Sequence, residues 1–206
     1  MSDSAFPDMT VRALQPTDAE ALYNLDYSFE TDSIYTLRSS GKLLHSGDET
    51  EACQEGEQRS FTFELIETPV DPPFYKDYRS DEITLATVQK RVQKADGGYV
   101  ALVNNEVAGG VLLHLEGWRS LTQIRDFIVG RQFRRYGIGS LLLKCAADWA
   151  RNQSCWAMLL ETSNIDYPTI QFYLHSGFEI WSINRHFYPP GPTENEAAIF
   201  LGKKLR

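Results

Sequence analysis

The architecture follows from one segment, Phe127-Ile128-Val129-Gly130-Arg131-Gln132-Phe133-Arg134-Arg135-Tyr136-Gly137-Ile138-Gly139-Ser140. It begins as an apolar strand and ends in the first turn of a helix. The apolar residues of that helix recur at helical spacing: Ile138, Leu141, Leu142, Cys145 and Trp149. Glycines between strand and helix leave main-chain N–H groups accessible at the positive end of the helix, which is a general anion site. The segment therefore predicts a phosphate-binding turn, with arginines nearby to offset negative charge.

Other phosphate-binding motifs fit this segment poorly. The chain has no G-x-x-x-x-G-K-[ST] sequence, which excludes a P-loop. Gly137-Ile138-Gly139 lacks the third glycine of a dinucleotide fingerprint, because Leu142 stands at that position. The alternative that remains open is a structural one, in which the two glycines only ease a tight turn from strand to helix.

The surrounding pattern predicts an α+β fold, with helices packed on a sheet. Strands are expected at residues 9–14, 60–68, 99–103, 106–116, 121–129, 156–160, 178–187 and 197–205. Helices are expected at residues 17–25, 80–94, 138–151 and 168–175, the first with a capping box at 17–20 and the second capped by Ser80. Prolines 69, 72 and 73 are expected to end the second strand. Residues 28–58 are polar and irregular and predict a long loop or an insertion.

Composition narrows the possible functions. The 206 residues are 42% hydrophobic with a formal net charge of −8, which disfavours nucleic acid as a partner and suits a cationic small molecule. No apolar run is long enough to span a membrane, and the N-terminus does not resemble a secretion signal. Cys53, Cys145 and Cys155 form no close-spaced pair, which favours reduced thiols and a cytoplasmic location. The four histidines show no metal-ligand spacing, so no metal site is expected.

Two linked motifs resemble those of the GNAT superfamily of N-acetyltransferases. Arg134-Arg135-Tyr136-Gly137-Ile138-Gly139 is similar to its [QR]-x-x-G-x-[GA] signature. Glu161-Thr162-Ser163-Asn164 and Phe172-Tyr173-Leu174-His175-Ser176-Gly177-Phe178 resemble the motif that follows. The resemblance implies a mixed, mostly antiparallel sheet, splayed at the coenzyme A site, with helices on both faces. It implies one domain over residues 1–206, with a substrate-side insertion around residues 28–60.

Within the superfamily, the chain resembles the streptothricin acetyltransferases. The pieces that carry this likeness are residues 26–33, 74–78, 160–162 and 196–200. Two positions depart from the usual pattern. Asp166 stands where an asparagine is common, seven residues before Tyr173, and Arg125-Asp126 replaces a Glu-Asp pair.

The resemblance implies that acetyl-CoA is bound by the segment quoted first. Its pantetheine would pair with the main chain of Phe127, Ile128 and Val129. Its diphosphate would lie on the segment from Arg134 through Arg135, Tyr136, Gly137, Ile138 and Gly139 to Ser140. Asn164 is expected to contribute as well.

Acetyl transfer requires the amine as its free base. At pH 7, removing the proton from a lysine-like ammonium costs about 4.6 kcal/mol, so a general base is valuable. Asp126 and Glu161 are the candidate bases. Tyr173 is the family's usual acid for the departing thiolate. Full proton donation by a tyrosine to a thiolate is uphill by about 2 kcal/mol, so a hydrogen bond to the sulfur is the alternative.

Acidic and aromatic residues are candidates for holding a cationic amine: Asp26, Glu30, Asp32, Tyr75, Asp77, Trp118 and Glu196. The hypothesis that leads is transfer of an acetyl group to the β-lysine amine of a streptothricin-type antibiotic. Other amines (a polyamine, an amino acid or a protein amine) and a non-catalytic CoA-binding sensor are the alternatives. The oligomeric state is left open, with a homodimer among the choices.

Overall fold

The computed structural model describes residues 8–40, 62–79 and 83–205. Its main sheet has seven strands in the order β1-β4-β5-β6-β7-β9-β8. Their bounds are β1 Met9–Ala13, β4 Gly97–Val103, β5 Glu106–Glu116, β6 Leu121–Val129, β7 Ala157–Ser163, β8 Glu179–Asn184 and β9 Ala198–Lys204. All neighbouring pairs are antiparallel except β6 and β7. This mixed sheet confirms the expected fold class.

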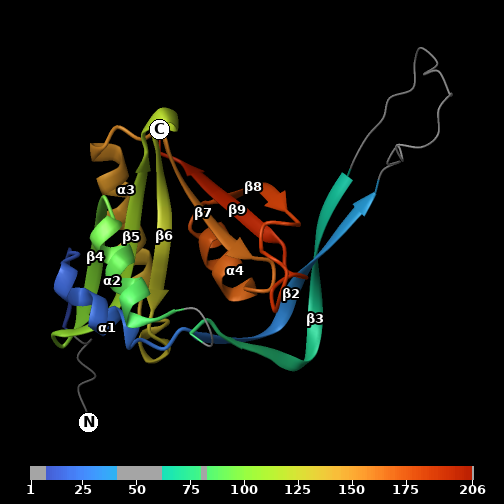
Figure 1. The fold of residues 1–206 in the computed structure, drawn as a ribbon, viewed down its shortest axis with the longest axis horizontal. Helices are drawn as coiled ribbons and strands as arrows, with labels where there is room; N and C mark the ends of the chain where they lie inside the picture. The colour runs from blue at the N-terminus through green and yellow to red at the C-terminus, as the bar shows by residue number, and fades with distance from the viewer. Residues whose placement is uncertain (1–7, 41–61, 80–82, 206) are drawn as a thin grey trace, which may run out of the picture.

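The sheet opens between β6 and β7 (Figure 1). These strands pair only over residues 121–123 and 157–159, although β6 continues to Val129 and β7 to Ser163. Beyond the paired stretch, β7 stays bonded to β9 while β6 stays bonded to β5. Arg125 is an extra residue in β6, because Asp126 faces Leu112 and Ile124 faces Leu113. Such a bulge bends a strand, and it lies where β6 leaves β7.

Helices cover both faces of the sheet (Figure 1). On one face, α1 (Ala19–Tyr23) and α2 (Leu85–Lys94) pack against Val100 and Leu112. On the other face, α3 (Ile138–Asn152) and α4 (Tyr167–His175) share a core with Val111 and Leu113. The opposite burial of Leu112 and Leu113 follows from the two-residue alternation of a strand. Three short 3-10 turns complete the described elements: η1 Pro16–Asp18, η2 Gly117–Arg119 and η3 Arg131–Phe133.

Two long strands lie outside the main sheet; the first was not expected, and the second was expected only up to residue 68. β2 (Ser28–Ser40) pairs antiparallel with β3 (Thr62–Asp77), so the prediction of an irregular stretch from residue 28 is wrong up to Ser40. Residues 41–58 lie outside the described residues. β3 also continues through its prolines, which were predicted to end it. The pairing of β2 with β3 shifts register at these prolines: Thr31 faces Phe74, whereas Ser33, two residues on, faces Pro69. In a two-stranded ribbon a proline can face away from the partner strand, so its missing N–H is tolerated.

The helix starts also differ from the sequence prediction. Helix α2 begins after Thr84, whose hydroxyl accepts a hydrogen bond from the Thr87 N–H at 3.2 Å. The predicted cap at Ser80 lies outside the described residues. At the first turn, the Asp18 side chain accepts from the Gln15 N–H at 2.8 Å, so the cap residue is Gln15 and lies before the predicted Thr17. Asp18 also pairs with Arg12 at 2.6 Å, which anchors the turn to β1.

Candidate active site

Two adjoining cavities lie where the sheet opens. The first, of about 440 Å³, lies between the end of β6, the start of α3 and one side of α4. The second, of about 670 Å³, lies between β6, β7, the end of β3 and the chain before β9. Seven residues line both cavities and form what we call the shared wall: Tyr27, Tyr78, Phe127, Ile128, Asp166, Thr169 and Tyr173. The shared wall is therefore where molecules bound on the two sides would meet.

The turn at the start of α3 is held open by glycine. Gly137 has a φ of 82°, in the left-handed region that L-residues seldom adopt, and a Cβ there would meet no atom within 4 Å. The first helical hydrogen bond runs from the Leu141 N–H to the Gly137 carbonyl, so the three preceding amides lack a helical partner. Gly137, Gly139 and Ser140 line the first cavity. This turn has the geometry that an anion requires at a helix N-terminus.

Gly139 serves a different purpose from Gly137. A Cβ on Gly139 would lie 3.1 Å from the ring of Phe172 in α4. Glycine therefore allows α3 and α4 to approach, and Phe172 in turn packs against Phe127 with 5.7 Å between ring centroids. The two glycines of the motif thus fix the backbone turn and the width of the first cavity, respectively.

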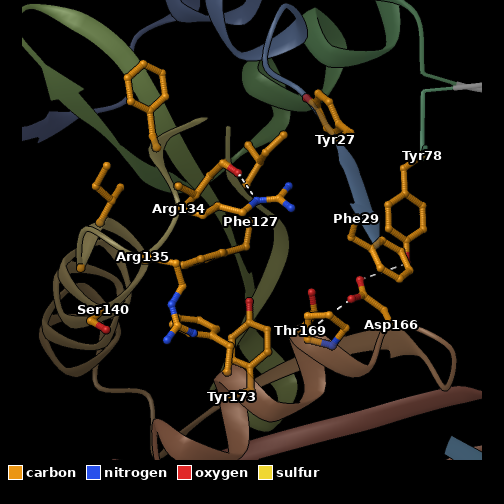
Figure 2. Close-up of a pocket in the computed structure, with 18 residues that line it drawn as sticks. Tyr27, Phe29, Tyr78, Phe127, Arg134, Arg135, Ser140, Asp166, Thr169 and Tyr173 are labelled. Carbon is orange, nitrogen blue, oxygen red and sulfur yellow. Dashed lines mark hydrogen bonds between the residues drawn. The ribbon is translucent and has the colours of Figure 1, made fainter. Parts of the chain in front are cut away.

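Arg134 connects the two sides of the site. Its guanidinium donates to the carbonyl oxygens of Val129 at 3.0 Å, Ser28 at 2.8 Å and Asp26 at 3.4 Å. Burial lowers the pKa of this guanidinium from its usual value. The sequence interpretation placed Arg134 beside the diphosphate, whereas here its donors brace the start of β2 against the end of β6. Arg135 lies on the wall of the first cavity (Figure 2).

The main chain of β6 is oriented for pairing inside the opening. The Gly130 N–H donates to Ala108 in β5, whereas the Val129 carbonyl accepts from Arg134. Since the N–H and carbonyl of one strand residue point the same way, the Val129 N–H points away from β5 and toward the opening. By the same alternation, the main-chain N–H and carbonyl of Phe127 also point toward the opening. Strand β6 therefore offers main-chain groups to an extended molecule in the first cavity.

Tyr173 in α4 extends its hydroxyl into the first cavity (Figure 2). Its ring is only 2% exposed and packs edge-on against Phe127, Phe172 and Phe178. Burial, followed by the charge of Asp166, raises the pKa of the Tyr173 hydroxyl above its usual value. A hydroxyl with a raised pKa is a poorer acid and remains a hydrogen-bond donor, which favours the hydrogen-bonding alternative for its role.

Both candidate bases line the second cavity, and each has a partner. Asp126 Oδ1 pairs with Arg91 at 2.6 Å, while Asp126 Oδ2 is buried with no hydrogen-bond partner among the described residues. Glu161 accepts a hydrogen bond from the Tyr188 hydroxyl. Burial raises the pKa of Glu161, and the bond from Tyr188 opposes that rise.

Known proteins resemble this chain in sequence and in fold. The model of the acetyltransferase (GNAT) family matches residues 52–178, more than half of the chain. The chain belongs to the acetyltransferase (GNAT) family. It is 28% identical over 192 residues to a streptothricin acetyltransferase of Streptomyces lavendulae, covering 92% of each chain. Streptothricin acetyltransferase A of Bacillus subtilis (strain 168) is 28% identical over 128 residues, 62% of this chain and 72% of that one.

Solved structures of the GNAT family have the same fold. A nourseothricin acetyltransferase superposes with a TM-score of 0.75 at 26% identity, covering 96% of this chain and 99% of that one. A putative streptothricin acetyltransferase from Bacillus anthracis, solved in complex with acetyl coenzyme A, superposes with a TM-score of 0.70 at 23% identity. It covers 96% of this chain and 98% of that one. The chain is therefore a GNAT acetyltransferase that uses acetyl-CoA.

The lining of the first cavity suits the pantetheine and diphosphate of acetyl-CoA. The open space above Gly137 and the three amides before Leu141 suit a diphosphate, and the β6 groups of Phe127 and Val129 suit an amide-bearing chain. Bound there, acetyl-CoA supplies an activated acetyl group as a thioester. The Val129 N–H can donate to the carbonyl oxygen of that group, and the Tyr173 hydroxyl can donate to its sulfur.

Several residues expected at the site lie elsewhere. Asn164 donates to the Tyr35 carbonyl at 2.6 Å and accepts from the Ala197 N–H at 2.7 Å, so it joins β2 to the chain before β9. Trp118 is 85% exposed in η2, at the paired end of β6 and away from the opening. Neither cavity is lined by these two residues or by a further set of expected ones: Asp26, Glu30, Asp32, Tyr75 and Tyr136. The cofactor and substrate roles given to these seven residues therefore stay predictions.

Four residues with side-chain roles at the site were not among those predicted from the sequence. Tyr27, Tyr78 and Asp166 stand on the shared wall, and Tyr188 bonds Glu161 in the second cavity. Tyr27 and Tyr78 were within the short pieces that resemble streptothricin acetyltransferases, which was the available signal. Asp166 had been noted only as a departure from the usual asparagine. No periodicity or motif marked Tyr188.

Other expectations concern metals and membranes. Within residues 8–40, 62–79 and 83–205, no group of three or more histidine, cysteine, aspartate or glutamate residues is arranged to hold a metal ion. Over the same ranges, the helices are too short or too polar to cross a membrane.

Proposed function

We propose that this acetyltransferase modifies a primary amine of a small polycationic molecule, the β-lysine amine of a streptothricin-type antibiotic. The observation that carries the proposal is the charge of the second cavity. Five carboxylates line it, Asp77, Asp126, Glu161, Asp166 and Glu196, against three cationic side chains, Lys76, Arg91 and Arg125. A cavity with an excess of acidic groups concentrates cations and discriminates against anions.

Ion pairing inside the cavity leaves that excess on carboxylates that have no cationic partner. Lys76 is occupied by Glu196 at 2.6 Å, and Arg91 by Asp126 at 2.6 Å. Among the described residues, Glu161 and Asp166 have no cationic partner within 4 Å. A cationic amine would supply the missing charge. The buried Asp126 Oδ2, which has no hydrogen-bond partner, offers it a further acceptor.

The relatives support the same substrate class. Two of them are called streptothricin acetyltransferases, and one of these covers 92% of this chain. The nourseothricin acetyltransferase aligns over 96% of the chain, which includes β2 and β3 as well as the cofactor motif. Likeness outside the shared cofactor motif is the part that bears on the substrate, because the superfamily shares its cofactor site and varies its substrate site.

The nearest alternative keeps the chemistry and changes the amine to a polyamine, an amino acid or a protein amine. Polyamines also match an acidic cavity by charge. The remaining alternative is a CoA-binding sensor that transfers no acetyl group.

Release of free coenzyme A thiol, followed for a panel of amines, tests the proposal. The panel contains streptothricin, spermidine, lysine and a short peptide, and mass spectrometry of each product locates the added acetyl group. We expect the highest kcat/KM with streptothricin. A higher value with spermidine or the peptide would refute the substrate proposal, and background release with every amine despite CoA binding would favour the sensor.

A pair of variants ties the substrate to the second cavity. Glu161→Gln removes one buried carboxylate, and the lost charge-assisted hydrogen bond predicts a KM for streptothricin about 10- to 100-fold higher. Trp118→Ala is the matched control, because Trp118 is exposed away from both cavities. Its KM should equal that of the wild type. A larger effect from Trp118→Ala than from Glu161→Gln would contradict this placement of the substrate.

We further propose a single domain over residues 1–206 and a cytoplasmic location, which the three cysteines without a close-spaced pair support. A homodimer is the alternative to a monomer. Light scattering on the purified protein decides between them.

A further inference from the structure

The shared wall of the two cavities contains one carboxylate, Asp166, and one tyrosine bonded to it, Tyr78. We propose that Tyr78 takes the proton of the attacking amine, and that Asp166 acts through Tyr78 by accepting the tyrosine proton. The proposal deepens the proposed function and rests on acetyl transfer to an amine. It does not depend on which amine the enzyme prefers.

Tyr78 and Asp166 lie on the shared wall, whereas the two bases predicted from the sequence do not. Asp126 and Glu161 line the second cavity but not the first. A group that removes the amine proton must lie within hydrogen-bond reach of the amine while the amine contacts the acetyl carbon. That contact occurs where the cavities meet, and there the wall presents Tyr78 and Asp166.

Two hydrogen bonds fix the orientation of the Asp166 carboxylate. Asp166 is 6% exposed and caps α4, where Oδ1 accepts from the Thr169 N–H at 3.2 Å. Its other oxygen, Oδ2, accepts from the Tyr78 hydroxyl at 3.1 Å (Figure 2). Among the described residues, no lysine, arginine or histidine lies within 4 Å of this carboxylate. A proton on Oδ2 would therefore meet no cation that repels it.

Tyr78 is placed to receive the amine proton. Its hydroxyl hydrogen is directed at Asp166, which leaves the oxygen lone pairs to accept from a donor in the cavities. Tyr27, the other tyrosine of the wall besides Tyr173, instead donates its hydroxyl to the Leu22 carbonyl at 3.1 Å. Tyr27 has no such bond to Asp166, so among the three tyrosines of the wall it is Tyr78 whose hydroxyl is hydrogen-bonded to a carboxylate.

Every bond and proton in the proposed acetyl transfer is accounted for. The amine enters this step as its free base, after its ammonium proton has passed to solvent. The amine nitrogen forms a bond to the acetyl carbon, and the bond from that carbon to sulfur breaks with its electron pair left on sulfur. One N–H proton passes to the Tyr78 oxygen while the Tyr78 proton passes to Asp166 Oδ2. The Tyr173 hydroxyl hydrogen-bonds the sulfur. Asp166 then returns its proton through Tyr78 to solvent or to the thiolate, which restores the starting state.

Several charged or titratable groups face this pair and set its pH dependence. Asp166 is faced by Tyr173 of α4 and, at longer range, by Arg134, whereas Tyr78 is faced by Lys76, Tyr188 and Glu196. Burial raises the pKa of Asp166, and the bonds from Thr169 and Tyr78 oppose the rise. A carboxylate with a raised pKa is a stronger base, so the geometry and the electrostatics agree.

Asp166→Asn is the decisive variant, because asparagine keeps the cap bond from Thr169 and removes the proton acceptor. With an amine that the wild type acetylates, we expect kcat to fall about 10²- to 10⁴-fold with the KM for acetyl-CoA unchanged. The part of the acidic limb of the kcat/KM profile that Asp166 contributes should disappear, which leaves the limb set by deprotonation of the amine. Tyr78→Phe should lower kcat similarly, and the double variant should be no worse than the slower single variant, as for residues that act as a unit.

A second measurement needs neither substrate nor activity. Since folding raises the pKa of Asp166 above 3.8, its protonated form stabilises the protein below pH 3.8, and this contribution is lost as pH rises through the folded pKa. The Tm of the unliganded Asp166→Asn protein should therefore rise relative to wild type between pH 4 and pH 8. A variant that is less stable at every pH, with kcat retained, would show a purely structural aspartate and overturn the proposal. A loss confined to acetyl-CoA affinity, or losses that multiply in the double variant, would overturn it too.

Discussion

Replacement of Gly137 by aspartate should prevent acetyl-CoA from binding while the protein still folds. A Cβ at Gly137 would point into open space at the first cavity, so the new carboxylate would face the position inferred for the diphosphate. Two unit charges 4 Å apart near a protein surface repel by about 4 kcal/mol. That energy corresponds to a loss of about 10³-fold in affinity.

Asparagine at the same position is the matched control. Asparagine and aspartate tolerate a left-handed backbone better than other L-residues, so both variants should lose a similar 1–2 kcal/mol of stability, about 2–8 °C in Tm. The two variants differ by one charge. The ratio of their Kd values for acetyl-CoA, measured by titration calorimetry, therefore isolates repulsion from steric effects.

The ratio should be about 10³ at low salt and should shrink as salt screens the added charge. Equal Kd values for Gly137→Asp and Gly137→Asn would show that no phosphate lies beside this residue. The same result would remove the start of α3 from the cofactor site. Unequal melting temperatures without ligand would show instead that the two variants differ in folding, and the affinities would then need correction for the folded fraction.

Three further substitutions address the tyrosine, the brace and the buried glutamate. Tyr173→Phe should lower kcat about 10²-fold with the Kd for acetyl-CoA unchanged, and equal turnover would remove Tyr173 from the reaction. Arg134→Met leaves three carbonyls without their charged donor, so urea titration should show a loss of about 2–4 kcal/mol, and an unchanged midpoint would contradict the bracing role. Glu161→Gln should be more stable than wild type at neutral pH, with the gap closing below pH 4.5. Burial raises the pKa of Glu161, so its stabilising protonated form is lost as pH rises, and a gap independent of pH would refute this sign.

The cofactor half of the site could be predicted from the sequence because it is local. Strand β6, the turn at Gly137 and helix α3 are consecutive, and each has a strong signal in apolar spacing or in glycine placement. The ends of α3 and β6 were predicted within a residue of those observed. The bracing role of Arg134 was not predicted, because two of its three acceptors lie in residues 26–28, whose position in space the sequence does not show.

The substrate half was harder because its residues come from distant segments. Asp77, Asp126, Glu161 and Glu196 meet in the second cavity only after β3, β6, β7 and the chain before β9 are assembled. Choosing residues by charge alone also selected Asp26, Glu30 and Asp32, which line neither cavity. Strand β2 was missed for a related reason. Its polar residues, and the prolines of its partner β3, are unfavourable for a buried strand but acceptable in an exposed two-stranded ribbon.

The division of the site into a local half and an assembled half explains how one family can serve different amines. The cofactor half depends on one continuous segment, so it can persist while the residues of the second cavity change. The two halves are not independent, however, because Arg134 from the cofactor turn holds residues 26–28 at the start of β2. Tyr27 lies within that held segment and stands on the shared wall. A change in the cofactor turn should therefore reach the wall through Arg134, whereas a change of carboxylates at the far side of the second cavity should leave acetyl-CoA binding intact.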